Sequence, residues 1–399
     1  MGKILEYIDS HNGGDFKCYN TRKSSLDYNN GDVVTSENSD LDTTPSDTKG
    51  RFAEDDARLF NTVQIPNSLI ISTPPYFRYF LDGSRHTYKV DDISIGNKIF
   101  PIVAGQIVVG CCYRPDRDTF RKADLGQDGG IRKKIILSLP KLFHTKGKAE
   151  DFARDYCRQL NESCLRASRY ASSHKIEIDK IVFYKVDGPS VDESNKNAYL
   201  NSAIAQIQNE MTDEEQLMVR DLCRENKLTS DSWLIKDGSF QYNPNFSRTE
   251  KSEWNNMKMN YKYVVGVSKS FDPGLLKSYD GKKLSQIIAN LKPFERTRAY
   301  KYVSSHSDGQ TFAVWYLRLR QSDFRETRFS DVVKCELLLT NETIKTETID
   351  AISANLIREA YPVCFGSDSR WANHLYPVYL TETFCKSQYI DSDIFLSLF

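Results

Sequence analysis

Apolar residues along this chain gather in short runs that are separated by Gly, Asp and Asn turn signals. Between residues 77 and 113 the pattern predicts three consecutive antiparallel strands, at about 77–82, 86–99 and 101–113, because Asp-Gly and Gly-Asn dipeptides divide the runs. Similar runs predict further strands at 132–140, 178–186, 233–240, 263–271, 310–320 and 332–340.

Other segments carry apolar residues at every third or fourth position, which is the period of an amphipathic helix. Strands therefore occur both as a meander and separated by helices, and this order predicts a mixed β-sheet flanked by helices, in an α/β or α+β domain. The predicted helices lie at 1–14, 52–60, 149–173, 193–227 and 348–362, and 376–390 is amphipathic as well.

Residues 29–50 differ in composition from the rest of the chain. They are rich in Ser, Thr, Asp and Asn and contain no aromatic residue, so they cannot bury enough apolar surface to order themselves. We therefore expect a flexible N-terminal extension, residues 1–60, with a disordered linker at about 29–50 and a role as a docking arm. Residues 61–399 are expected to form the main domain.

The charge balance limits how the chain can meet nucleic acid. Lys and Arg number 54, and Asp and Glu also number 54, so the formal net charge is zero. Contacts with phosphate must then come from a local basic patch, or a partner must deliver the strand. Nine cysteines without a CxxC pair predict reduced, buried thiols. The sequence shows neither a signal-peptide core nor a long apolar run, so we expect a soluble, cytoplasmic protein.

Two similar strings, FLDGSR at 80–85 and IKDGSF at 235–240, each place an aspartate where an apolar run ends. A single Asp-Gly-Ser string is most often a turn. Two of them on neighbouring strands would bring Asp82 and Asp237 to one edge of the sheet, where like charges need a cation to share them. The pair predicts a site for Mg²⁺ or Mn²⁺, and two such ions could drive hydrolysis of a phosphodiester bond.

An acidic helix between the two strings offers candidates for a third carboxylate, although most acids on such a helix belong to its solvated face. The candidates are Glu210, Glu214, Glu215 and Glu225. After the second string, the strand YVVGVSKSF carries Lys269 near its end, and its ammonium could bind a phosphate. A lysine that merely reaches solvent from the strand end is the alternative.

Clustered basic residues with interleaved aromatics predict a groove that follows a nucleic-acid backbone, although solvated strand faces have the same composition. The candidates are Arg114, Arg132, Lys133, Lys134, Arg318 and Arg320. The Gly-rich string DLGQDGG lacks the GK[ST] of a phosphate-binding loop, and neither an HExxH nor a G-x-S-x-G string occurs. These absences argue against a nucleotide hydrolase, a zinc protease and a serine hydrolase.

Taken in order, five segments resemble the NurA nuclease family over about residues 75–390: the first DGS strand, the acidic helix, the second DGS strand, the VGVSK strand and a C-terminal YP-x-x-L segment. The resemblance implies an RNase H-like domain that degrades DNA with Mn²⁺ or Mg²⁺, with two ions in the site. It also implies a homodimer that docks on a HerA-like hexameric ATPase, which pumps duplex DNA towards the nuclease.

Position by position, the resemblance makes Asp82 and Asp237 metal ligands, and Lys269 matches the lysine of the family's G-[IV]-[SA]-K strand. Glu215 is the choice for the helical acid, as a metal ligand and catalytic residue. Glu214 and Glu210 remain its rivals.

The chain departs from the family after the YP-x-x-L segment, where an Ala-His pair is usual and Thr383 and Phe384 stand instead. His374 precedes the segment and is out of register, and Glu382 is a candidate replacement for the missing ligand. The departure leaves open an altered metal preference, a divergent subfamily or reduced activity.

Two functions fit these residues. The first is a metal-dependent DNA nuclease that works with a HerA-like translocase in end processing or anti-phage defence. The second is a non-catalytic nucleic-acid-binding or scaffold subunit that keeps the fold, which the missing histidine and the neutral net charge favour. The two aspartates and Lys269 favour the nuclease, because a scaffold has no use for clustered carboxylates.

Overall fold

The structure is a computed structural model, which describes most of the chain. The described residues are 2–10, 16–26, 52–55, 61–126, 129–144, 147–165, 176–186, 197–240, 258–271, 273, 284–303, 311–320, 327–364 and 371–399.

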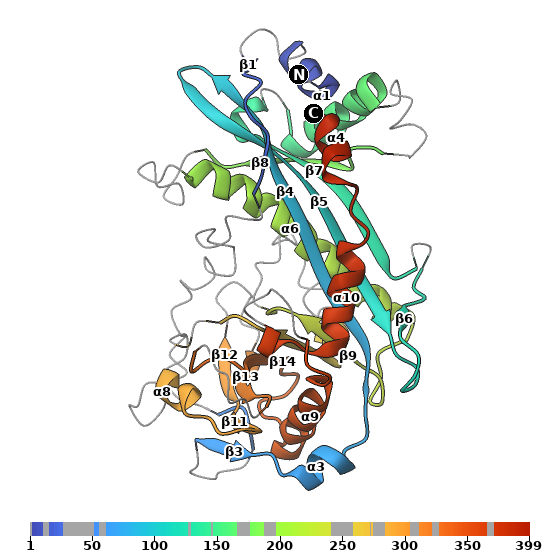
Figure 1. Cartoon of the computed structure of the whole chain (residues 1–399), viewed down its shortest axis with the longest axis vertical. Helices are drawn as coiled ribbons and strands as arrows, with labels where there is room; N and C mark the ends of the chain where they lie inside the picture. Colours follow the sequence, from blue (N-terminus) through green and yellow to red (C-terminus); the bar gives the residue numbers. More distant parts are fainter. Residues whose placement is uncertain are drawn as a thin grey trace.

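A single mixed sheet runs through the described residues (Figure 1). From one edge to the other its strands are β3 (Thr62–Gln64), β11 (Glu295–Thr297), β13 (Thr311–Arg318), β14 (Val332–Leu338), β10 (Val264–Ser268), β9 (Trp233–Asp237), β4 (Phe77–Ile95), β5 (Lys98–Tyr113), β7 (Ile131–Pro140) and β8 (Lys180–Tyr184). Four short strands lie off this path: β1 (Phe16–Cys18) and β2 (Ser24–Ser25) pair with β4, β6 (Arg121–Lys122) pairs with β5, and β12 (Tyr300–Val303) pairs with β13.

The centre of the sheet has the order β7-β5-β4-β9-β10. The first three strands form an antiparallel meander, and β9 and β10 then add in parallel to β4 and to each other. Three antiparallel strands followed by two parallel ones is the arrangement expected of an RNase H-like sheet. The predicted mixed sheet flanked by helices is therefore confirmed.

Strand β4 does not break where the sequence predicted a break. It continues for 19 residues and pairs with β5 from Tyr79 to Ile95, so Asp82, Gly83 and Ser84 lie inside a strand and form no turn. A turn was expected because Asp-Gly-Ser is a common turn sequence. Here Gly83 serves packing, because a Cβ at this position would lie 2.4 Å from Oε1 of Glu215.

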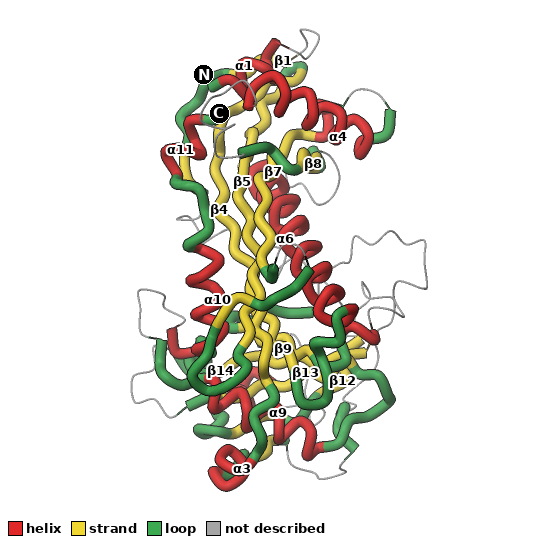
Figure 2. Tube along the Cα trace, turned by 90° about the vertical axis from the view of Figure 1, so that its right-hand side faces the viewer, coloured by secondary structure: helices red, strands yellow, loops and turns green. Residues whose placement is uncertain are grey.

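Helices cover both faces of the sheet (Figure 2). They are α1 (Lys3–Ser10), α3 (Asn67–Ser72), α4 (Ala149–Leu160), α6 (Ala198–Arg224), α8 (Leu284–Ala289), α9 (Thr346–Glu359), α10 (Tyr376–Lys386) and α11 (Ser392–Ser397). Single turns lie at η3 (Lys141–Phe143) and η5 (Trp371–Asn373), and a π-helical turn, η4 (Asn161–Leu165), continues α4.

Helices α6 and α10 lie on opposite faces of the central strands. On β5, a Cβ at Gly105 would meet Ile207 of α6, whereas a Cβ at Gly110 would meet Cys385 of α10. Side chains alternate between the two faces along a strand, so positions 105 and 110 point to opposite faces. Figure 2 shows the same separation, with the sheet between the two helices.

The described parts of the first 60 residues pack against the rest of the molecule. Ile4, Leu5 and Ile8 of α1 are fully buried, and the amide of Gly2 donates to the carbonyl of Phe399. The chain ends therefore lie close together (Figure 1). These contacts do not fit a free docking arm. The linker expected at 29–50 lies outside the described residues, and the domain division stays a prediction.

The helix predicted at 52–60 is wrong for residues 52–55, which form isolated bridges. Phe52 pairs with Tyr300, and Glu54 pairs with Ile344. The Glu54 carboxylate accepts from the guanidinium of Arg296 at 2.9 Å, and both side chains are buried. This ion pair anchors residues 52–55 to β11. The spacing of apolar residues in so short a segment could not reveal such a contact.

Other sequence-based expectations concern the whole chain. All nine cysteines are free thiols in this structure, and eight of them are buried, as the sequence predicted. Among the described helices, α6 is the longest, and neither it nor any other combines the length and apolarity needed to cross a bilayer.

Candidate active site

Asp82 and Asp237 lie side by side on the face of the sheet that α10 covers. Leu81 of β4 pairs with Lys236 of β9, and both side chains point to the α6 face. The next residue of each strand, Asp82 and Asp237, therefore points to the opposite face. Asp82 is only 4% exposed, and its Oδ2 atom has no hydrogen-bond partner among the described residues. Burial raises the pKa of Asp82 well above its usual value, and the neighbouring charge of Asp237 raises it further.

Lys269, which follows β10 directly, bridges two carboxylates at this place. Its Nζ lies 2.9 Å from Oδ2 of Asp237 and 3.2 Å from Oε2 of Glu382, and the side chain is 8% exposed. Burial alone would lower the pKa of Lys269, but the charges of Asp237, Glu382 and Asp82 outweigh it and raise the pKa. The lysine is therefore charged, and in this structure it lies between the two carboxylates.

Glu382 brings α10 into the site. Its Oε1 accepts from Lys386 at 2.7 Å, one helical turn further on, and Nδ1 of His374 lies 3.9 Å from its Oε2. Burial would raise the pKa of Glu382, but Lys269 and Lys386 outweigh burial and lower it to about 2. Glu382, considered from the sequence only as a replacement ligand, thus joins the two aspartates. The same fold brings His374 beside it, although spacing along the chain had set that histidine aside.

Glu215 does not join this group. Its Oε1 occupies the space above Gly83, which points to the α6 face, and its Oε2 lies 2.8 Å from Nζ of the buried Lys236. Asp82 precedes Gly83 on the strand and therefore points to the other face. The predicted role of Glu215 as a ligand beside Asp82 and Asp237 does not fit this placement.

The rivals of Glu215 also pair elsewhere on the α6 face. Glu214 accepts from Arg132 at 3.0 Å and from Lys134 at 2.5 Å, and Glu210 accepts from Lys180 at 2.5 Å. Spacing identified an acidic helix, but it could not show which face of the sheet the helix covers.

Two buried groups hold the backbone around Asp237. Nζ of Lys236 donates to the carbonyl oxygen of Asp237 at 2.9 Å. Beyond it, the hydroxyl of Ser239 and the amide of Phe240 donate to the carboxylate of Glu336, which is fully buried on β14. Lys236 and Glu336 each pair across the strands with Gly266, so both contacts lie on the α6 face of the sheet and hold the residues between Asp237 and Phe240 from that face.

Two of the six basic residues predicted to contact DNA are buried inside the protein. The guanidinium of Arg318 is fully buried and donates to three backbone carbonyls, and that of Arg320 donates to the carbonyls of Ala360 and His374. An interior guanidinium cannot reach a phosphate, so these positions do not fit the predicted role. The long apolar runs around both arginines were the signal for burial.

The remaining predicted DNA contacts lie nearer the surface. Arg132 and Lys134 face α6 in the ion pairs with Glu214, and Arg114 forms a two-pronged pair with Glu359. Lys133 is exposed and points to the face of α10, because it pairs across the strand with Val108, two residues from Gly110. Of these four residues, Lys133 alone combines exposure with that face.

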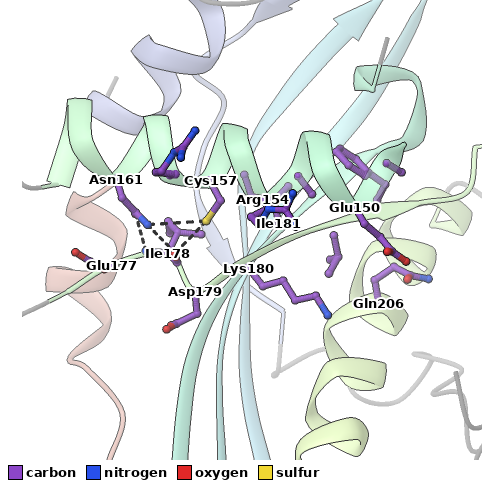
Figure 3. A pocket seen from close by; sticks show the side chains of 15 residues that line it. Glu150, Arg154, Cys157, Asn161, Glu177, Ile178, Asp179, Lys180, Ile181 and Gln206 are labelled. Atoms are coloured by element: carbon purple, nitrogen blue, oxygen red, sulfur yellow. Dashed lines mark hydrogen bonds between the residues drawn. The ribbon is translucent and has the colours of Figure 1, made fainter. Parts of the chain in front are cut away.

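A pocket of about 740 Å³ lies apart from the carboxylates, between α4 and β8 (Figure 3). Arg154, Cys157 and Asn161 line it from the helix side, and Lys180 lines it from the strand. Asn161 exchanges two hydrogen bonds with the backbone of Ile178, which fixes the approach to β8. The pocket shares no residue with the site on β4 and β9.

The residues of the site can be tested against the divalent cation that the sequence predicted. A buried carboxylate oxygen without a hydrogen-bond donor, beside a second carboxylate, is a donor set that suits Mg²⁺ or Mn²⁺. Within the described residues, however, no group of three or more His, Cys, Asp or Glu side chains is arranged to hold a metal ion. The positive charge beside Asp237 and Glu382 is that of Lys269. Asp82 and Asp237 therefore fit a cation, and the third ligand is not preformed.

Comparisons with known proteins give little further constraint. No protein-family model matches this chain, and no curated protein matches it by sequence. Among solved structures, the NurA nuclease from Sulfolobus solfataricus matches 78% of this chain and 80% of its own length, with a TM-score of 0.35 and 9% identity. Similarity at this level does not define a family, so the function has to be inferred from the residues of the site.

Proposed function

We propose that this chain is a metal-dependent DNA nuclease whose site is formed by Asp82, Asp237, Lys269 and Glu382. The observation that supports it most is the buried Asp82, whose Oδ2 lacks a hydrogen-bond donor and whose neighbour is a second carboxylate. A buried carboxylate without a hydrogen-bond donor costs folding free energy, so it is expected where it binds a cation.

Each side chain of the site has its own proposed role. Asp82 and Asp237 hold Mn²⁺ or Mg²⁺, in a site for up to two ions, and Glu382 on α10 is the third carboxylate. A bound ion would activate water and stabilise the leaving oxygen of a phosphodiester. Lys269 contacts a phosphate oxygen of the strand, and Lys236 keeps the backbone of Asp237 in place from the other face.

The partner follows from the order of sequence motifs and from the charge of the chain. A neutral protein, most of whose predicted DNA-binding arginines are held in internal contacts, is poorly equipped to capture DNA alone. We propose that a HerA-like hexameric ATPase delivers DNA to a homodimer of this chain in the cytoplasm. End processing and anti-phage defence are the two proposed settings.

The direct test is degradation of linear duplex and single-stranded DNA with Mn²⁺ or Mg²⁺, with and without a HerA-type partner. Asp237→Asn should lower the rate by at least about a hundredfold, because one carboxylate ligand is lost. Glu214→Gln is the matched control, since it removes a carboxylate on the opposite face. Equal rates for the wild type and Asp237→Asn would contradict the proposal.

A non-catalytic scaffold subunit is the second candidate. The observation that favours it is the ammonium of Lys269, which already neutralises Asp237 and Glu382 without a metal. Thermal melts with and without Mn²⁺ separate the two functions. A nuclease should melt at a higher temperature with Mn²⁺, because an ion that binds only the folded state stabilises it, whereas a scaffold should show no shift.

A further inference from the structure

We propose that the ammonium of Lys269 competes with the divalent metal for Asp237. The lysine must leave Asp237 before the metal ion can bind fully. This inference rests on the proposed function, because it assigns a control step to the same site. It gives Lys269 two positions: one between the carboxylates in the metal-free protein, and one towards the phosphate when metal and DNA are present.

The charges around the lysine already balance. Asp237 and Glu382 supply two negative charges, and Lys269 and Lys386 supply two positive charges in direct contact with them. A divalent ion that entered this set would meet two carboxylates that are already neutralised, and only the neighbouring Asp82, whose Oδ2 lacks a hydrogen-bond donor, could add negative charge. It would also share Oδ2 of Asp237 with an ammonium that lies 2.9 Å from the same oxygen.

The two cations cannot occupy these positions together at low cost. An ion such as Mg²⁺ binds carboxylate oxygen at about 2 Å, so it would lie within roughly 5 Å of the ammonium on the same oxygen. Repulsion between a divalent ion and an ammonium at that separation is strong where water is largely excluded, and Lys269 is 8% exposed. Metal entry therefore displaces the lysine, and the displaced ammonium becomes available to the DNA phosphate.

Metal affinity and cleavage should then change in opposite directions when Lys269 loses its charge. Lys269→Gln is expected to bind Mn²⁺ at least about tenfold more tightly, because the ion no longer competes with an internal cation. The same variant should cleave DNA more slowly, because the phosphate contact is lost. A purely structural lysine would give weaker metal binding, since its loss would disorder the carboxylates.

The experiment is calorimetric titration of the metal-free full chain with Mn²⁺ in the absence of DNA, for the wild type and two variants. Lys386→Gln is the matched control, because Lys386 also pairs with Glu382 but is 58% exposed and does not contact Asp237. Its Mn²⁺ affinity should change less than about threefold, as expected for an exposed ion pair. Circular dichroism checks that each variant is folded.

A second measurement uses only the wild type, in case Lys269→Gln does not fold. Acetylation of lysines, followed by mass spectrometry, should label Lys269 slowly in the metal-free protein and faster at saturating Mn²⁺. Labelling of Lys269 that Mn²⁺ leaves unchanged would overturn the inference, as would a Lys269→Gln variant that binds Mn²⁺ no better than the wild type. If neither protein binds Mn²⁺, the proposed nuclease function fails as well. If the wild type binds Mn²⁺ and Lys269→Gln binds it no more tightly, only the proposed competition by Lys269 fails, and the proposed nuclease function stands.

Discussion

Charged side chains buried on the two faces of β4 and β9 distinguish this molecule at the scale of single residues. On one face Lys269 pairs with Asp237 and Glu382, and on the other Lys236 pairs with Glu215. Two adjacent residues of one strand, Lys236 and Asp237, therefore take part in separate charge clusters. Breaking a buried pair leaves an uncompensated charge, so each cluster is expected to tolerate substitution poorly.

Asp82→Asn should stabilise the metal-free protein at neutral pH, although it should abolish cleavage. The pKa of Asp82 is raised in the folded state, so its contribution to stability is present at low pH and is lost as the pH rises through that pKa. Asparagine has no charge to bury, and the gain at pH 8 should be about 1–3 kcal/mol.

Thermal melts in EDTA between pH 4 and pH 9 measure this effect. The curves of wild type and Asp82→Asn should converge at the acid end and separate as the pH rises. A variant that is less stable than the wild type at pH 8 would show that the ionised Asp82 has partners that offset its burial.

At the scale of elements, α10 sets the position of Glu382, and the glycines of β5 set the distance between strand and helix. A Cβ at Gly110 would lie 2.5 Å from Sγ of Cys385, and both residues are enclosed. Gly110→Ala should push α10 outward, at a cost of about 1–3 kcal/mol in stability, and weaken Mn²⁺ binding through the displaced Glu382.

Gly105→Ala is the control for this displacement. Its Cβ would lie 3.0 Å from Ile207 on α6, so it also crowds the interior, but on the face without the site. It should lose stability and keep its Mn²⁺ affinity. Calorimetry that finds the same affinity for both variants would contradict the assignment of Glu382 to the metal.

Elements with a strong hydrophobic period were predictable from the sequence. The predicted strands at 132–140, 263–271 and 332–340 correspond to β7, β10 and β14, and the helix at 193–227 corresponds to α6. The continuous β4 was not predictable, because the glycine in its Asp-Gly-Ser string is required by a side chain 132 positions away in the sequence, Glu215. Pairing with β5 overrides the local turn preference.

The site was predictable as far as strands carry it. Asp82 lies on β4, Asp237 ends β9 and Lys269 directly follows β10, and these three strands are neighbours in the sheet. The apolar run of each strand located these residues in the sequence. The third acid comes from a helix, and helical spacing does not fix the face on which a helix packs. Glu382 lies in an amphipathic stretch whose packing on β4 and β5 only the fold reveals.

At the scale of the whole molecule, the chain closes on itself, with the N-terminal helix packed beside the C-terminal residues (Figure 1). The same C-terminal region supplies α10 and hence Glu382. The proposed function therefore depends on one feature of the architecture: the site lies on the face of the sheet covered by α10, and not on the face covered by α6.

Cleavage of linear DNA with Mn²⁺ by Glu382→Gln and Glu215→Gln, side by side, tests that claim most directly. Both variants replace a lysine-paired carboxylate by an uncharged isostere, and the two side chains are 15% exposed in Glu382 and 6% exposed in Glu215, so the variants differ chiefly in the face they affect. We expect Glu382→Gln to lose at least about tenfold in rate and Glu215→Gln, where it folds, to stay within a few-fold of the wild type. Loss of cleavage in Glu215→Gln with full activity in Glu382→Gln would contradict the account and move the site to the other face of the sheet.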